Sequence, residues 1–243
     1  MSPTPRPAAK KSPPALAAAA KLRAGYGKTA VCGEVSFALR PKESLALIGP
    51  NGAGKSTVLK TVVGGLAPVQ GSCSVFGAAP DDRSLAFRRD VAVVLDEDAF
   101  FPSLTLREHL AIIAAGHGVP DVEGAIDAEL GFFGLAKQGD SLPNSLSSGQ
   151  RRRLLLAAAF VRPRKLLVLD EPEQRLDTSM RQQLAARLRQ EVAEGLGLLL
   201  VTHDPEFLLA SATTALSISD TVQSLKPAQA AAAISATNPL AGQ

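Results

Sequence analysis

The sequence predicts an α/β fold built on a largely parallel sheet. Two apolar runs of strand length, 166–169 and 198–201, contain no polar residue, which is typical of strands buried on both faces of a parallel sheet. Segments with the apolar spacing of helices alternate with such runs along the chain. The composition agrees with this class, because 243 residues with 46% hydrophobic and 20% charged side chains can bury a sizeable core.

The individual elements follow from the local pattern. The predicted strands are 34–39, Ser44–Ile48, 91–95, 166–169 and 198–201. A helix is predicted after a glycine-rich turn, with one apolar face formed by Val58, Leu59, Val62 and Val63. Further helical patterns cover 105–133 (interrupted at 116–120), Ser148–Phe160 and Thr178–Glu194.

The two ends of the chain differ from the body. Five of the 17 prolines fall within the first 14 residues, so residues 1–15 are expected to form a disordered arm. Residues 226–243 are rich in alanine and carry only Lys226 as a charge, and a flexible tail is expected there. One domain is therefore predicted over 16–225.

The net charge of +3 does not indicate a nucleic-acid partner. Four basic residues lie in the two ends (Arg6, Lys10, Lys11 and Lys226), and residues 21–225 hold 22 basic and 23 acidic side chains. Only 4% of the residues are aromatic, so platforms for stacking bases are scarce. No apolar run reaches the roughly 18–20 residues of a membrane span, and the two cysteines cannot form a disulfide framework or a four-cysteine zinc site.

A phosphate-binding loop is predicted between the strand Ser44–Ile48 and the helix that follows it. The motif G-x-x-x-x-G-K-[ST] is matched by Gly49, Pro50, Asn51, Gly52, Ala53, Gly54, Lys55, Ser56 and Thr57. Glycines let successive backbone N–H groups turn towards phosphate oxygens, at the positive end of a helix. Lys55 is expected to reach the β- and γ-phosphates, and the Ser56 hydroxyl is expected to bind Mg²⁺. A chance glycine-rich turn is the alternative.

Two adjacent carboxylates follow the buried strand 166–169. Asp170 is expected to hold Mg²⁺ and Glu171 to polarise the attacking water, since alternation along a strand points them to different sides. Alone, this pair is equally compatible with an acidic turn that caps the next helix. Its place after a phosphate-binding loop favours the catalytic interpretation.

The order of the motifs resembles that of the ATP-binding cassette (ABC) family. Leu146-Ser147-Ser148-Gly149-Gln150 is similar to the LSGGQ signature, and Val201-Thr202-His203-Asp204 is similar to the segment with the switch histidine. The resemblance covers roughly residues 16–225 and implies a P-loop NTPase core with N-terminal antiparallel strands and a helical signature subdomain at about 97–160.

The resemblance also implies a head-to-tail dimer with ATP and Mg²⁺ between its subunits. ATP would lie between the P-loop of one subunit and the signature residues of the other: Ser147, Ser148, Gly149 and Gln150. Tyr26 would stack on adenine, although it could equally be a strand-edge residue. His203 would contact the γ-phosphate and Glu171, and Asp177 would belong to the loop that joins the two sites.

Three positions depart from the family pattern. Asp96 stands where the family has Gln before the helical subdomain, and a carboxylate can bind Mg²⁺ but cannot donate a hydrogen bond. Ser148 replaces a glycine of the signature, which is tolerable if its φ is negative. Residues 173–177 replace the usual Thr-Ser-(Ala/Gly)-Leu-Asp, so communication across the dimer is expected to differ.

The run Arg151-Arg152-Arg153 is expected to be solvated or to touch neighbouring acids.

The resemblance favours the ATP-hydrolysing subunit of a transporter, with separate transmembrane permease subunits. Two alternatives are a soluble cassette that acts in translation or on DNA, and a regulatory cassette with weak turnover. Lys55 and Ser147 are only 92 positions apart, which leaves no room for the long coiled coil of chromosome-associated relatives. A peripheral place on the cytoplasmic face of the membrane is expected, with a docking groove around Asp96–Phe101 and the helices that follow. Phe100 and Phe101 suit such a contact, although a core role is equally compatible with each. The resemblance slightly favours an exporter.

Overall fold

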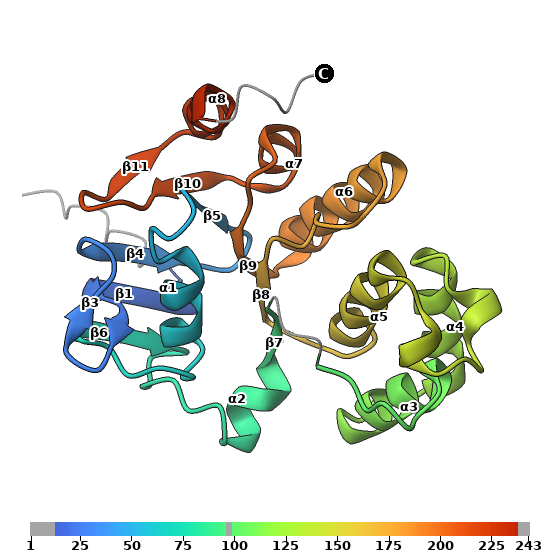
Figure 1. Ribbon diagram of the computed structural model, residues 1–243. Helices are drawn as coiled ribbons and strands as arrows, with labels where there is room; N and C mark the ends of the chain where they lie inside the picture. The colour runs from blue at the N-terminus through green and yellow to red at the C-terminus, as the bar shows by residue number, and fades with distance from the viewer. Residues whose placement is uncertain (1–12, 96–98, 238–243) are drawn as a thin grey trace, which may run out of the picture.

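The computed structural model describes residues 13–95 and 99–237, and it confirms the predicted α/β class (Figure 1). A six-stranded sheet has the order β11-β10-β5-β9-β8-β7. Its strands are β5 (Ser44–Ile48), β7 (Val91–Val94), β8 (Leu166–Asp170), β9 (Gly197–Val201), β10 (Thr214–Ser217) and β11 (Gln223–Leu225). All neighbours pair in parallel except β10 and β11, which are antiparallel.

The predicted N-terminal antiparallel strands are also present. They form a three-stranded sheet of order β4-β1-β6, from β1 (Ala17–Arg23), β4 (Val35–Leu39) and β6 (Gln70–Val75). A small hairpin joins β2 (Gly25–Tyr26) to β3 (Thr29–Ala30). The central strand β1 was not predicted, because its Ala-Ala-Ala-Ala-Lys-Leu-Arg sequence has weak strand propensity. Hydrogen bonds to strands on both sides, β4 and β6, hold it in the sheet.

The six-stranded sheet separates two hydrophobic cores. Along β8, Leu167 and Leu169 join one core, and Leu166 and Val168 join the other. The second core also contains α1 (Lys55–Val62) and the antiparallel sheet. The first core contains residues of the helices α3 (Leu106–Gly116), α4 (Val122–Phe132), α5 (Ser148–Phe160), α6 (Thr178–Glu194), α7 (Pro205–Ser211) and α8 (Pro227–Thr237). Two faces covered by helices or a second sheet explain why the central strands are apolar throughout.

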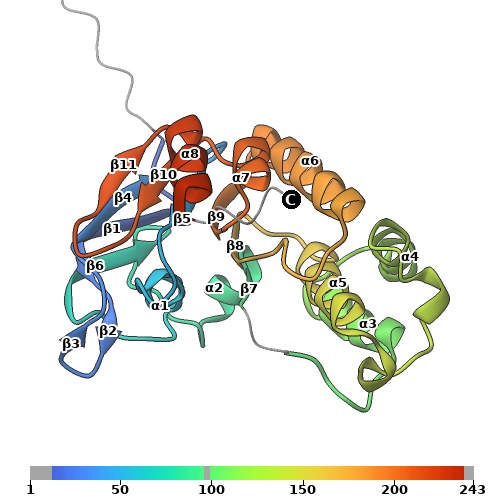
Figure 2. The same cartoon turned by 45° about the horizontal axis from the view of Figure 1, so that its top comes forward.

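The helices α3, α4 and α5 form a lobe apart from the antiparallel sheet and α1 (Figures 1 and 2). Two short 3₁₀ helices, Ala136–Gln138 and Pro143–Ser145, connect α4 to α5, and α2 (Leu85–Asp90) precedes β7. No helix in the described part of the chain is both long and apolar enough to cross a membrane.

The prediction of a flexible tail at 226–243 is wrong for most of these residues. Residues Pro227–Thr237 form α8, which packs against α7 and β10 and buries Ala230, Ala231 and Ile234. Its apolar residues recur at helical spacing, so burial of one face supplies the stability that the alanine-rich sequence lacks alone. Most of the arm expected at 1–15 lies outside the described residues.

Candidate active site

The loop between β5 and α1 has a backbone shape that depends on glycine. Gly49, Gly52 and Gly54 have positive φ angles of 140°, 81° and 90°. A Cβ atom on Gly49 would lie 2.2 Å from the carbonyl oxygen of Ile218, which follows β10. Any other residue at this position would force the two backbone segments apart.

Lys55 is the first residue of α1, and its side chain turns back over this loop. The Nζ atom donates hydrogen bonds to the carbonyl oxygens of Gly49 and Pro50, both at 2.9 Å, and the residue is only 6% exposed. Burial lowers the pKa of Lys55, whereas the nearby charges of Glu171 and Asp170 raise it. The loop therefore holds a buried amine that an incoming anion can reach by displacing two carbonyl contacts.

The N-terminus of α1 is open to an anion. Gly54 is the N-cap residue, no side chain among the described residues caps the helix, and its first turn carries no acid. The N–H groups of a helix's first turn lack intrahelical acceptors and carry the positive end of the helix dipole. Together with Lys55, these groups favour a phosphate at this end.

Three neighbouring strands bring the predicted motifs to one edge of the sheet. Because β5, β9 and β8 are parallel neighbours, their carboxyl ends lie together. The glycine-rich loop follows β5, Asp170 and Glu171 lie at the end of β8, and His203 follows β9. Asp170 is 3% exposed. The topology thus brings a lysine, two carboxylates and a histidine to one site.

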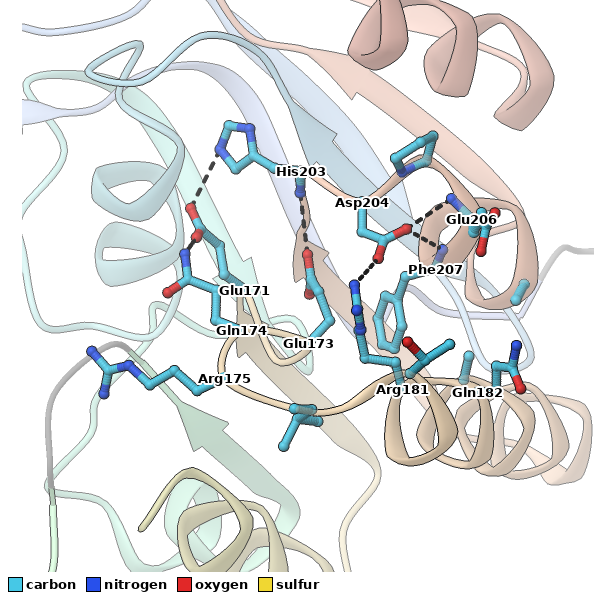
Figure 3. Close-up of a pocket in the computed structure, with 15 residues that line it drawn as sticks. Glu171, Glu173, Gln174, Arg175, Arg181, Gln182, His203, Asp204, Glu206 and Phe207 are labelled. Carbon is cyan, nitrogen blue, oxygen red and sulfur yellow. Dashed lines mark hydrogen bonds and ion pairs between the residues drawn. The ribbon is translucent and has the colours of Figure 1, made fainter. Parts of the chain in front are cut away.

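Glu171 lies beside His203, as Figure 3 shows. The Nε2 atom of His203 is 3.3 Å from Oε1 of Glu171, and the Gln174 amide donates to Oε2 of the same carboxylate. The hydrogen bond from His203 is the main cause of a pKa of Glu171 below its ordinary value, although partial burial opposes it. Glu171 is therefore ionised at neutral pH and can accept a proton.

Glu173 is a buried carboxyl in the same region, and sequence patterns assigned it no role. The Thr202 hydroxyl donates to its Oε1 atom at 2.5 Å, and the backbone N–H of His203 donates to the same atom at 3.2 Å. Its Oε2 atom has no hydrogen-bond partner within the described residues. Burial raises the pKa of Glu173. Only its departure from the family pattern could have drawn attention to it.

The signature segment caps α5. The Ser147 hydroxyl accepts from the Gln150 N–H at 3.3 Å, and the Gln150 side chain accepts from the Ser147 N–H at 2.9 Å, a capping box. Ser148 lies within the helix, so it needs no positive φ. A Cβ on Gly149 would lie 2.7 Å from the carbonyl oxygen of Arg175, so the loop after β8 touches α5 at this glycine.

Asp177 also connects the loop after β8 to α5. It is the N-cap residue of α6, where it accepts from the Met180 N–H at 2.9 Å, and it forms an ion pair with Arg153 of α5. Views of the chain from two directions show α5 in one lobe and α1 in the other (Figures 1 and 2). A single chain therefore holds the signature residues apart from its own P-loop.

Two further predicted residues lie elsewhere. Tyr26 is on the β2–β3 hairpin with 57% of its surface exposed. Asp96, predicted as a metal ligand, lies outside the described residues. Within residues 13–95 and 99–237, no group of three or more His, Cys, Asp or Glu residues is arranged to hold a metal by itself.

The arginine run on α5 is only partly as predicted. Arg153 touches an acid, Asp177, but Arg152 is 5% exposed and donates to backbone carbonyls at the ends of β7 and β8. The prediction of a solvated face is therefore wrong for Arg152. Local sequence cannot show that a charged side chain on a helix points into a junction of strands.

A cavity of about 720 Å³ lies between the two lobes. Its walls come from α1, α2, β7, α3 and α5 and include Lys60, Phe87, Val93, Ile113 and Leu155. Phe101 is 54% exposed, whereas Phe100 packs against the hydrophobic core that contains the helical lobe. Of the described residues in the predicted 96–101 region, Ala99 lines this cavity.

Comparison with known proteins gives a consistent result. Residues 32–174 match the family model described as ABC transporter. The chain is 36% identical over 180 residues to a Nod factor export ATP-binding protein I from Rhizobium etli, covering 73% of this chain and 57% of that protein. It is 33% identical over 188 residues to the SkfA peptide export ATP-binding protein SkfE of Bacillus subtilis, covering 76% of this chain and 78% of that protein. The chain thus spans little more than half the length of the Nod factor relatives.

A solved structure agrees with the whole described fold. The structure titled as an ATP binding subunit of an ABC transporter superposes with a TM-score of 0.78 and 28% sequence identity. The superposition covers 94% of this chain and 95% of the other. On the motifs, the fold and these comparisons, the chain belongs to the family of ATP-binding proteins of ABC transporters.

Proposed function

We propose that this chain binds and hydrolyses ATP as the energy-supplying subunit of an export-type ABC transporter. The observation that carries the proposal is the meeting of Lys55, Asp170, Glu171 and His203 at the carboxyl ends of β5, β8 and β9. Two relatives are named for export, one of Nod factors and one of a peptide. Their names support export as the direction and leave the substrate of this chain open.

The P-loop fits the phosphates of ATP. Positive φ angles at its glycines and the open N-terminus of α1 direct backbone N–H groups to an anion, and Lys55 adds a positive charge. Ser56 and Asp170 would hold Mg²⁺, since a hydroxyl and a carboxylate are oxygen donors that suit it, and Asp96 is a further candidate. When bound, Mg²⁺ neutralises charge on the β- and γ-phosphates.

Glu171 is the proposed general base. Its ionised carboxylate accepts a proton from the water whose oxygen forms a bond to the γ-phosphorus. The bond from that phosphorus to the bridging oxygen breaks, and ADP and phosphate are the products. His203 lies against Glu171 through its Nε2 atom and would contact the γ-phosphate on the same side. Tyr26, exposed on its hairpin, would stack on adenine.

A second subunit would complete the site. Because α5 lies in the other lobe, Ser147, Ser148, Gly149 and Gln150 would meet the ATP bound to a partner chain in a head-to-tail dimer. Asp177, on the loop next to α5, would belong to the same contact. The cavity between α1, α3 and α5 would receive a transmembrane permease subunit, which would hold the protein on the cytoplasmic face of the membrane.

The substitution Glu171→Gln tests the assignment of the base. ATP turnover is expected to fall by about 100-fold or more, since general base catalysis contributes about 10²–10⁴-fold. ATP binding is expected to persist, and ATP-bound dimers should accumulate in size-exclusion chromatography. Glu206→Gln is the matched control, because Glu206 and Glu171 line one pocket beside His203, and Glu206 is exposed. Equal turnover in the two variants would remove Glu171 from the mechanism.

Recovery of a multi-span membrane protein with the detergent-solubilised chain tests the transport partner.

A further inference from the structure

Arg152 joins the signature helix to the ends of two strands. It lies in the second turn of α5, is 5% exposed, and its Nη1 atom donates to the carbonyl oxygen of Leu95 at 3.2 Å. Its Nη2 atom donates to the carbonyl oxygens of Asp170 and Glu171, the latter at 2.9 Å. Leu95 directly follows β7, and Asp170 ends β8. One guanidinium therefore ties α5 to the two strands beside the site.

The peptide that Arg152 holds is strained. Glu171 has a φ of 46°, in the left-handed region that a residue with a Cβ rarely adopts. Its N–H donates to the Val201 carbonyl at 3.0 Å, and its carbonyl accepts from the Gln174 N–H at 3.1 Å. Arg152 adds charge-assisted hydrogen bonds to the carbonyls on both sides of the strained φ. Such a conformation persists only where its surroundings fix it.

We propose that Arg152 is a positioning residue, which fixes the direction of the Glu171 side chain and couples it to the helix that begins at the signature segment. Ser147 and Arg152 lie on the same short helix, α5, so a displacement of the signature moves the guanidinium that holds the Glu171 peptide. The inference rests on the proposed function, because the direction of Glu171 matters for hydrolysis. A planar guanidinium with several donors serves carbonyls of two strands at once, which a lysine ammonium cannot do in the same geometry.

Arg162 provides a matched control at the opposite end of the same helix. It follows α5 and donates to the carbonyl oxygen of Arg88 at 2.8 Å and to that of Val91, at the beginning of β7. Arg162 therefore makes the same kind of contact as Arg152, an arginine bound to backbone carbonyls, here of α2 and of the first residue of β7, away from Glu171. Loss of either arginine removes comparable hydrogen bonds, so general destabilisation affects both variants alike.

Amide hydrogen exchange, resolved to residues 170–174, tests the proposal without turnover. In Arg152→Gln, exchange at the amides of Glu171 and Gln174 is expected to rise about tenfold or more, since the variant loses hydrogen bonds from a charged donor. Arg162→Gln should leave these amides within about twofold of the wild type. Equal protection of 170–174 in the two variants would overturn the proposal. If Arg152→Gln does not fold, Arg152→Lys decides. The supporting result is then an increase in exchange over the wild type that is larger in 170–174 than in α6.

Kinetics give the second readout. Arg152→Gln is expected to lower kcat for ATP by about tenfold or more, with the Kd for ATP within about twofold of the wild type, because the P-loop is intact. Arg152→Lys should recover part of this loss. A loss of ATP affinity with unchanged kcat contradicts a positioning role. If the wild-type chain hydrolyses no ATP, the proposed function fails, whereas the exchange comparison still decides the role of Arg152.

Discussion

Two glutamates only two positions apart, Glu171 and Glu173, have opposite electrostatic environments. Glu171 accepts a hydrogen bond from His203 and has a lowered pKa. Glu173 is 6% exposed, and burial raises its pKa. At the residue scale, the first is suited to accept a proton from water and the second to hold the Thr202 hydroxyl and the His203 backbone N–H in place.

The substitution Glu173→Gln is expected to stabilise the protein at pH 8. The ionised carboxylate of Glu173 is buried with one oxygen unpaired among the described residues, and a neutral amide avoids that charge. We expect a gain of about 1–3 kcal/mol in the free energy of unfolding, measured with urea.

The gain should depend on pH in a defined direction. Because the folded pKa of Glu173 is raised, its carboxyl favours the folded state below the ordinary glutamate pKa of 4.5, and this contribution is lost as the pH rises through the folded pKa. The difference between Glu173→Gln and the wild type should therefore shrink as the pH falls towards 4.5. Glu206→Gln, on an exposed residue, should show no such trend. An equal difference at pH 5 and pH 8 would contradict the raised pKa.

At the element scale, a charged cluster joins α4 to α6. Arg187 of α6 forms a two-armed ion pair with Glu129 of α4, at 2.7 and 2.6 Å, and also contacts Glu191 at 3.1 Å. Its guanidinium lies 4.6 Å from the ring centre of Phe132 and 4.3 Å from that of Phe160. One arginine therefore joins α6 to α4 through ion pairs and lies over aromatic rings of α4 and α5.

The substitution Arg187→Lys should destabilise the protein by about 1–3 kcal/mol, because a lysine keeps the charge but loses the two-armed geometry and the ring contacts. Urea unfolding measures the change. Arg189→Lys is the control, because Arg189 is exposed on the same helix and should shift stability by less than about 0.5 kcal/mol. Equal effects of the two substitutions would show that the Glu129 pair contributes nothing beyond charge.

At the scale of the whole molecule, the P-loop and the signature segment lie apart in one chain, and the proposed function completes each site with a second chain. A mixture of Lys55→Ala and Ser147→Arg chains tests this arrangement, since a head-to-tail heterodimer of the two variants keeps one intact site. The mixture is expected to recover about a quarter of the wild-type ATPase rate if sites act independently. The doubly substituted chain mixed with wild-type chain gives heterodimers without an intact site. Each single variant alone should be inactive, and a mixture that stays inactive contradicts shared sites.

Much of this molecule was predictable from local sequence. The phosphate-binding loop depends on glycines at fixed spacing, and the buried strands β8 and β9 are recognisable because their apolar runs have no polar interruption. The boundaries of α5 and α6 also agree with the predicted Ser148–Phe160 and Thr178–Glu194. These features follow from backbone conformation and side-chain periodicity, which neighbouring residues determine.

The tertiary structure decided what depends on distant partners. The alanine-rich strand β1 exists because β4 and β6 pair with it, and α8 because one apolar face packs on α7 and β10. The different environments of Glu171 and Glu173, and the burial of Arg152, come from groups far away in the sequence. Desolvation and long-range hydrogen bonding set these properties, and neither can be inferred from a residue and its immediate neighbours.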